Sequence, residues 1–196
     1  MDWSIIKQSI CPESGKRLLE LARSTLEFRL GVANEVGRSG LDDESLQQQC
    51  GTFVTLKIKD VLRGCIGNLE ADGPIVDSIE RNALNAAFHD HRFEPLNAEE
   101  LGRVHIDISI LSKPERLDYS DGDDLTSKLR PLVDGVILRH GQKGATFLPQ
   151  VWSQLPDPET FLEHLCRKAG LSPSVWQNEH LDIYIYQVQC FEEDNK

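Results

Sequence analysis

The chain begins with a helical pattern of apolar residues. These residues are spaced three and four positions apart, and they are Leu18, Leu19, Ala22, Leu26 and Leu30. The spacing predicts a helix with one buried face, capped at Ser14 and running to about Gly37. The polar segment 38–44 that follows predicts a connector.

The pattern then changes to the alternation typical of a β-strand. Between Gly51 and Lys59, apolar and polar side chains take turns, as they do in a half-buried strand. Asp60 stands where a short turn would lead into a second strand. This region therefore predicts a hairpin whose second strand contains Leu62-Arg63-Gly64-Cys65-Ile66-Gly67, called the signature segment below.

A second helix and a third strand come next. Asp72-Gly73-Pro74 is a helix start signal, and the apolar stripe beyond it predicts a helix ending near His89-Asp90. A turn over 92–95 precedes a strand over 104–111. That strand has one isoleucine face and one polar face, and the polar face carries His105, Asp107 and Ser109.

The last third of the chain predicts another hairpin, a helix and a closing strand. Segments 135–138 and 145–148 flank a glycine-containing turn, a helix spans about 158–169, and a strand spans 181–191. The acid-rich segment 119–124 lacks the spacing of a calcium loop and favours helix capping.

Along the whole chain, helices and strands do not alternate regularly, so we predict an α+β fold with antiparallel sheets.

Size and charge narrow the class of protein. With 196 residues and 39% hydrophobic content, the chain is expected to form a single domain over 1–196 with its core over 14–191. A net charge of −11 disfavours nucleic-acid binding. The N-terminus has no basic region before an apolar run, so we expect a cytoplasmic protein without membrane attachment.

The cysteines and histidines give little sign of a metal or a disulfide framework. Five cysteines without a Cys-x-x-Cys pair fit a reduced protein. The only tight pair of candidate ligands is His89 and His91, which is a weak signal. The expectation is therefore no metal and no cofactor.

The signature segment is the best candidate for chemistry. Its two glycines would let the chain bend and present backbone N–H groups, and Arg63 gives Cys65 an electropositive neighbour. In the alternative interpretation Cys65 and Ile66 belong to a half-buried strand and the glycines serve a bulge.

The signature segment also resembles that of the AMMECR family, whose prokaryotic members are called AmmeMemoRadiSam system protein A. Five other segments match in order and spacing, namely 51–56, 90–96, 108–112, 135–138 and 147–152. The resemblance implies two unequal lobes, the larger containing both chain ends, with a cleft near the signature segment. It also implies a pathway shared with a Memo-like protein and a radical S-adenosylmethionine protein, whose cofactors have no ligand set in this chain.

The sequence favours an enzyme that acts on a small molecule or a protein group in a cleft around Cys65, and the alternative is a non-catalytic binding or adaptor module. In an enzyme, Cys65 would be the nucleophile, Asp90 or Asp107 the general base, and N–H groups of Gly64 to Gly67 the donors to an oxyanion. In a binding or adaptor module, Arg63 and Arg92 would hold an anionic metabolite or a partner segment. In a purely structural alternative, Arg92 would pair with Asp90 or Asp107 and hold the lobes together. For the enzyme and the binding module alike, we expect the substrate contacts to come from Arg63, Gly64, Gly67, Arg92 and Gln150.

Overall fold

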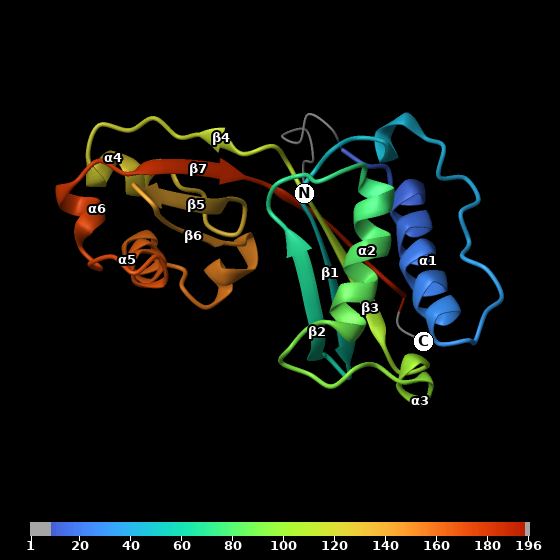
Figure 1. Cartoon of the computed structure of the whole chain (residues 1–196). Coiled ribbons are helices and arrows are strands. Elements are labelled where there is room, and N and C mark those ends of the chain that lie inside the picture. Colours follow the sequence, from blue (N-terminus) through green and yellow to red (C-terminus); the bar gives the residue numbers. More distant parts are fainter. Residues whose placement is uncertain (1–8, 195–196) are drawn as a thin grey trace. The chain divides into compact units, whose positions relative to one another are not determined.

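The computed structural model describes residues 9–194 and has the α+β architecture expected from the sequence (Figure 1). The chain divides into two compact units. One comprises the residues up to Ser112 together with those from Gln189 on, and the other comprises Lys113–Val188. Each unit contains a four-stranded sheet, with strand orders β2-β1-β3-β8 and β4-β7-β5-β6.

The first unit is a sheet covered on one face by two helices, which lie side by side in Figure 1. The helices are α1 (Pro12–Arg29) and α2 (Ile75–Phe88), with the short helices η2 (Glu44–Leu46) and α3 (Ala98–Leu101). The strands are β1 (Thr52–Ile58), β2 (Val61–Asn68), β3 (His105–Leu111) and β8 (Val188–Glu192). The paired strands β1, β2 and β3 are antiparallel.

The apolar stripes that the sequence shows form the core of this unit. Leu18 and Leu21 of α1 and Ile79 of α2 are fully buried. They pack in one cluster with the inward residues of the sheet, Val54, Leu56, Ile106 and Ile108. Each strand alternates, so the opposite face of the same sheet carries the polar side chains.

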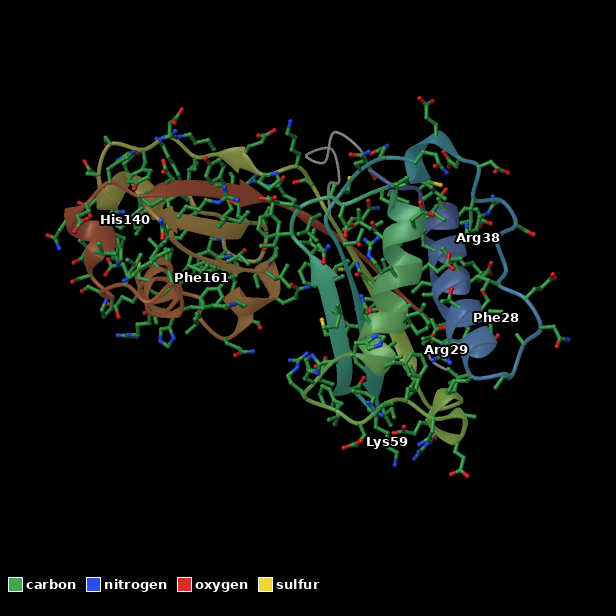
Figure 2. The ribbon with its side chains drawn as sticks, viewed as in Figure 1. Phe28, Arg29, Arg38, Lys59, His140 and Phe161 are labelled. Carbon is green, nitrogen blue, oxygen red and sulfur yellow. The ribbon has the colours of Figure 1, made fainter. Side chains whose placement is uncertain are left out.

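The second unit has its own sheet and core. Its strands are β4 (Glu115–Arg116), β5 (Gly135–His140), β6 (Lys143–Phe147) and β7 (Asp182–Tyr186), and its helices are α4 (Gly122–Lys128), η3 (Pro149–Ser153), α5 (Pro158–Lys168) and α6 (Val175–Asn178). Phe161, labelled on α5 in Figure 2, is fully buried and stacks on Trp152 with the ring centroids 3.6 Å apart. The acid-rich segment does cap a helix, since Asp121 accepts from the Asp124 N–H.

Two boundaries of the first helix differ from the prediction. Cys11, not Ser14, is the N-cap, because Pro12 occupies the first turn and the Cys11 sulfur accepts from the Ser14 N–H at 3.4 Å. The helix ends at Arg29 and does not reach Gly37. Gly31 has a φ of +72°, a left-handed conformation that ends helices.

The predicted closing strand is in fact two strands. β7 pairs with β5 and β4 in the second sheet, whereas β8 is the neighbour of β3 in the first sheet. Gln187 lies between them and donates to the carboxylate of Asp134 at 3.0 Å. Periodicity alone does not show that a continuous strand pattern changes its sheet.

Candidate functional site

The signature segment lies in β2, an edge strand of the first sheet. Cys65 is opposite Thr55 of β1 in the antiparallel register. The Cys65 N–H turns away from β1 and donates to Asp90 Oδ2 at 2.9 Å. The outer edge of the strand is therefore closed at Cys65 by a side chain.

An ion pair between Asp90 and Arg92 provides this edge contact. Arg92 Nε donates to Asp90 Oδ1 at 2.9 Å, and Arg92 Nη2 donates to Asp90 Oδ2 at 2.7 Å and to the Cys65 carbonyl at 3.3 Å. The two side chains thus satisfy both backbone groups of Cys65, as a neighbouring strand would do.

The two partners differ in exposure. The Asp90 side chain is 3% exposed, and the Arg92 side chain is 56% exposed. Hydrogen bonds from Arg92 and from the Cys65 N–H hold the pKa of Asp90 well below its usual range. The bond to Asp90 raises the pKa of Arg92. A carboxylate with such a low pKa is a weak proton acceptor. Asp90 is therefore better suited to holding β2 in place than to acting as a general base.

Arg63 is held by a different carboxylate. Its Nε and Nη2 donate to the two oxygens of Glu100 at 3.1 and 3.0 Å, and Nη2 also donates to the Glu94 carbonyl at 2.8 Å. The side chain is only 14% exposed. Phe93 lies near both arginines, with its ring centroid 5.9 Å from the Arg63 guanidinium carbon and 5.5 Å from that of Arg92.

The glycines of the signature segment allow close packing and do not produce the expected bend. Neither Gly64 nor Gly67 has a positive φ. A Cβ on Gly64 would lie 2.1 Å from the Ala86 carbonyl oxygen of α2, and one on Gly67 would lie 2.1 Å from the Thr52 carbonyl oxygen. The alternative interpretation of the sequence is therefore correct in structure: the segment is a strand, with an irregularity in the β1–β2 register beside Gly64.

The Cys65 thiol is half-buried on the sheet face away from the helices, where it accepts a hydrogen bond from Thr55 Oγ1 at 3.2 Å. Asp107 of β3 is also opposite Thr55, on its other side. Two strand spacings, about 10 Å in all, separate the backbones of Cys65 and Asp107. Proton transfer between these two side chains would therefore need an intermediary.

The structure thus brings together Arg63, Cys65, Asp90 and Arg92. Gln150 is in η3 of the second unit. Sequence reasoning missed Glu100, although Asn97 and Glu100 have the spacing of a capping box, which they form. It also missed Thr55, which only the strand register identifies as the partner of Cys65.

Comparison with known proteins decides the family. The sequence profile of the AMMECR1 family matches residues 19–191. The chain belongs to the AMMECR1 family. Within residues 9–194, no helix of this AMMECR1 domain combines the length and apolar character needed to cross a membrane.

Archaeal AMMECR1 relatives match over most of their length. A protein of Methanothermobacter thermautotrophicus is 36% identical over 183 residues, covering 93% of this chain and 95% of the relative. Protein MJ0810 of Methanocaldococcus jannaschii is 35% identical over 184 residues, covering 92% and 90%. The crystal structure of the uncharacterized protein PH0010 from Pyrococcus horikoshii is similar with a TM-score of 0.82 at 32% identity, covering 94% of each chain.

The cysteines of the AMMECR1 domain should differ in their rates of alkylation. Cys65 is half-buried, whereas Cys166 is fully buried in the second core, where burial raises its pKa. We expect native Cys65 to react at least about tenfold faster than Cys166, and the exposed Cys11 to react faster than both. Timed iodoacetamide labelling with peptide mass spectrometry measures the rates. Faster labelling of Cys166 than of Cys65 would contradict this order.

Proposed function

We propose that this AMMECR1 domain is a binding module that holds an anionic group through Arg92, beside Cys65 at the outer edge of β2. The ligand class is a carboxylate or phosphate of a metabolite or of a partner's segment. One observation carries the proposal: Asp90 orients the guanidinium of Arg92 from one side, while more than half of the side chain faces solvent.

The hydrogen bonds of Arg92 leave one part of its fork available. Nε and Nη2 are directed to Asp90 and the Cys65 carbonyl. Within residues 9–194, Nη1 makes no hydrogen bond. A guanidinium that is already oriented loses little entropy when it binds, and its planar fork suits oxyanions.

Arg63 has a supporting role in this proposal. Its donors are directed to Glu100 and to the Glu94 carbonyl, and little of it is exposed. It thereby ties β2 to α3 and to the loop that carries Arg92. Arg92 is then the arginine that contacts the ligand.

A cysteine-dependent enzyme is the second candidate, favoured by a half-buried thiol that accepts from Thr55. Two observations make it the weaker one. Among the described residues, the Thr55 hydroxyl is the only side-chain group hydrogen-bonded to the Cys65 sulfur, so no base contacts the thiol. The Cys65 N–H, one of the expected oxyanion donors, already donates to Asp90.

The family resemblance supports a proposal for the cellular setting of this function. We propose a cytoplasmic protein that works with a Memo-like protein and a radical S-adenosylmethionine protein. A module that holds an anionic metabolite or a partner segment suits such a shared pathway. This association is a family-level analogy.

Capture of small molecules from a cell extract tests the binding function. We expect native mass spectrometry to show an anionic molecule on the wild type and on Cys65→Ala, with at least about tenfold lower occupancy on Arg92→Lys. Lysine keeps the charge beside Asp90 but loses the planar fork. Arg38→Lys is the matched control, because Arg38 is 55% exposed and pairs with Glu80.

The same experiment can also go against the binding module. Equal occupancy on wild type and Arg92→Lys would remove the arginine from the site. Loss of the ligand in Cys65→Ala, with a covalent adduct on the wild type, would favour the enzyme.

A further inference from the structure

Three potential metal ligands meet on the polar face of the first sheet. They are His105 and Asp107 of β3 and Glu192 of β8, and one ligand atom of each lies within 4.8 Å of the other two. The two strands are neighbours in the sheet, which places residues 87 positions apart in sequence in one cluster.

A buried oxygen in this cluster has no hydrogen-bond partner. Asp107 is 9% exposed, and among the described residues its Oδ1 is a buried atom without a hydrogen bond. Its neighbour is His105 Nε2 at 3.5 Å, which is beyond good hydrogen-bond geometry. An unsatisfied buried carboxylate oxygen is costly, and a cation is the partner that compensates it best.

The other oxygen of Asp107 is already in an ion pair. Lys57 Nζ contacts Asp107 Oδ2, and this contact raises the pKa of Lys57. Lys57 is opposite His105 in the β1–β3 register. With neutral His105, the charges of Lys57, Asp107 and Glu192 sum to −1, so the group retains a negative charge that Lys57 does not balance.

A pocket of the first unit borders part of the cluster. A pocket of about 660 Å³ lies within the first unit, and His105 and Glu192 are part of its wall. Its wall also includes Lys59, labelled in Figure 2 at the β1–β2 turn, and the helix residue Arg23. Asp107 is not among the residues of this wall, so the pocket borders the cluster at His105 and Glu192.

We propose that His105 Nε2, Asp107 Oδ1 and the Glu192 carboxylate bind a divalent first-row transition ion such as Zn²⁺ or Mn²⁺. One imidazole with two carboxylates is a donor set that these ions accept. Metal–ligand distances of about 2.1 Å require the donor atoms to move closer, and Glu192 is exposed and can turn inward. Three protein ligands leave coordination positions for water or for a substrate group. The site is independent of Arg92 and Cys65, and it departs from the sequence-based expectation of no metal.

Isothermal titration calorimetry of the full chain with Zn²⁺ tests the site. We expect one ion per chain, with at least about a 100-fold loss of affinity in His105→Gln. His164→Gln is the matched control, because His164 is an exposed histidine of α5, and it should leave the affinity unchanged.

Lys57→Met distinguishes this site from an adventitious one. Removing the ammonium makes the cluster more negative, so Zn²⁺ should bind at least about tenfold more tightly. Replacement of Zn²⁺ by Co²⁺ should give d–d bands without a thiolate charge-transfer band, which excludes binding by Cys190 nearby. No binding, equal affinity in His105→Gln, or weaker binding in Lys57→Met would overturn the proposal.

Discussion

Gly64→Ala should lower the free energy of unfolding of the first unit by about 3 kcal/mol, at the upper end of the usual cost of overpacking. The added Cβ would lie 2.1 Å from the Ala86 carbonyl oxygen, and that neighbour is helix backbone. A flexible side chain could turn away, but here β2 and α2 must separate. Hydrogen-exchange mass spectrometry on peptides of β2 and α2 measures the loss of protection.

Gly102→Ala is the matched control for this substitution. Gly102 has a φ of −67°, and apart from its two chain neighbours no residue has an atom within 4 Å of the position its Cβ would take. Its effect should be within about 0.5 kcal/mol. Normal protection of β2 in Gly64→Ala would contradict the close packing of the signature segment on α2.

Asp90→Asn should cost about 2–3 kcal/mol at neutral pH, because it weakens charge-assisted hydrogen bonds to Arg92 and to the Cys65 N–H. The folded state lowers the pKa of Asp90 below its ordinary value of 3.8. Its contribution to stability is therefore complete above that value and is lost as the pH falls towards the folded-state pKa. The difference between wild type and variant should shrink from pH 7 to about pH 3.

Urea unfolding followed by the β2 amide signals in NMR spectra gives these free energies for the first unit. Trp152 and Trp176 are in the second unit, so their fluorescence reports on that unit. Asp72→Asn is the control, because the Asp72–Arg81 pair is 40% exposed on both sides and should contribute little. An Asp90→Asn difference that stays constant or grows at acid pH would contradict the ionised buried pair.

Much of the secondary structure could be predicted because its signals are local. The β1–β2 hairpin, α2 and the isoleucine face of β3 follow from periodicity over a few residues. The end of α1 at Arg29 was missed because the left-handed Gly31 stops the helix although the apolar pattern continues. The division of the last strand between two sheets depends on partners far away in sequence.

The candidate site was predictable only in part, for the same reason. The sequence singled out Cys65, Asp90 and Arg92, but it did not show that Asp90 accepts from the Cys65 N–H 25 residues away. The Arg63–Glu100 pair spans 37 residues. Such pairs form only when the sheet, the helix and the loop are all in place, so spacing along the chain carries no signal for them.

The glycines of the signature segment show how one observation can fit two structures. Positive φ and close packing both exclude a Cβ, and the sequence does not distinguish them. In the folded chain Gly64 and Gly67 are extended strand residues that approach backbone oxygens. Between these two glycines, the backbone N–H of Cys65 donates to Asp90 and its carbonyl accepts from Arg92, while its thiol is half-buried.

A crystal structure of the wild-type protein with the anionic molecule captured from cell extract tests the binding function most directly. The proposed function predicts an oxyanion on Arg92 Nη1, an intact Asp90–Arg92 pair and an unmodified Cys65 sulfur. Electron density continuous with the Cys65 sulfur, with no contact to Arg92, would contradict it.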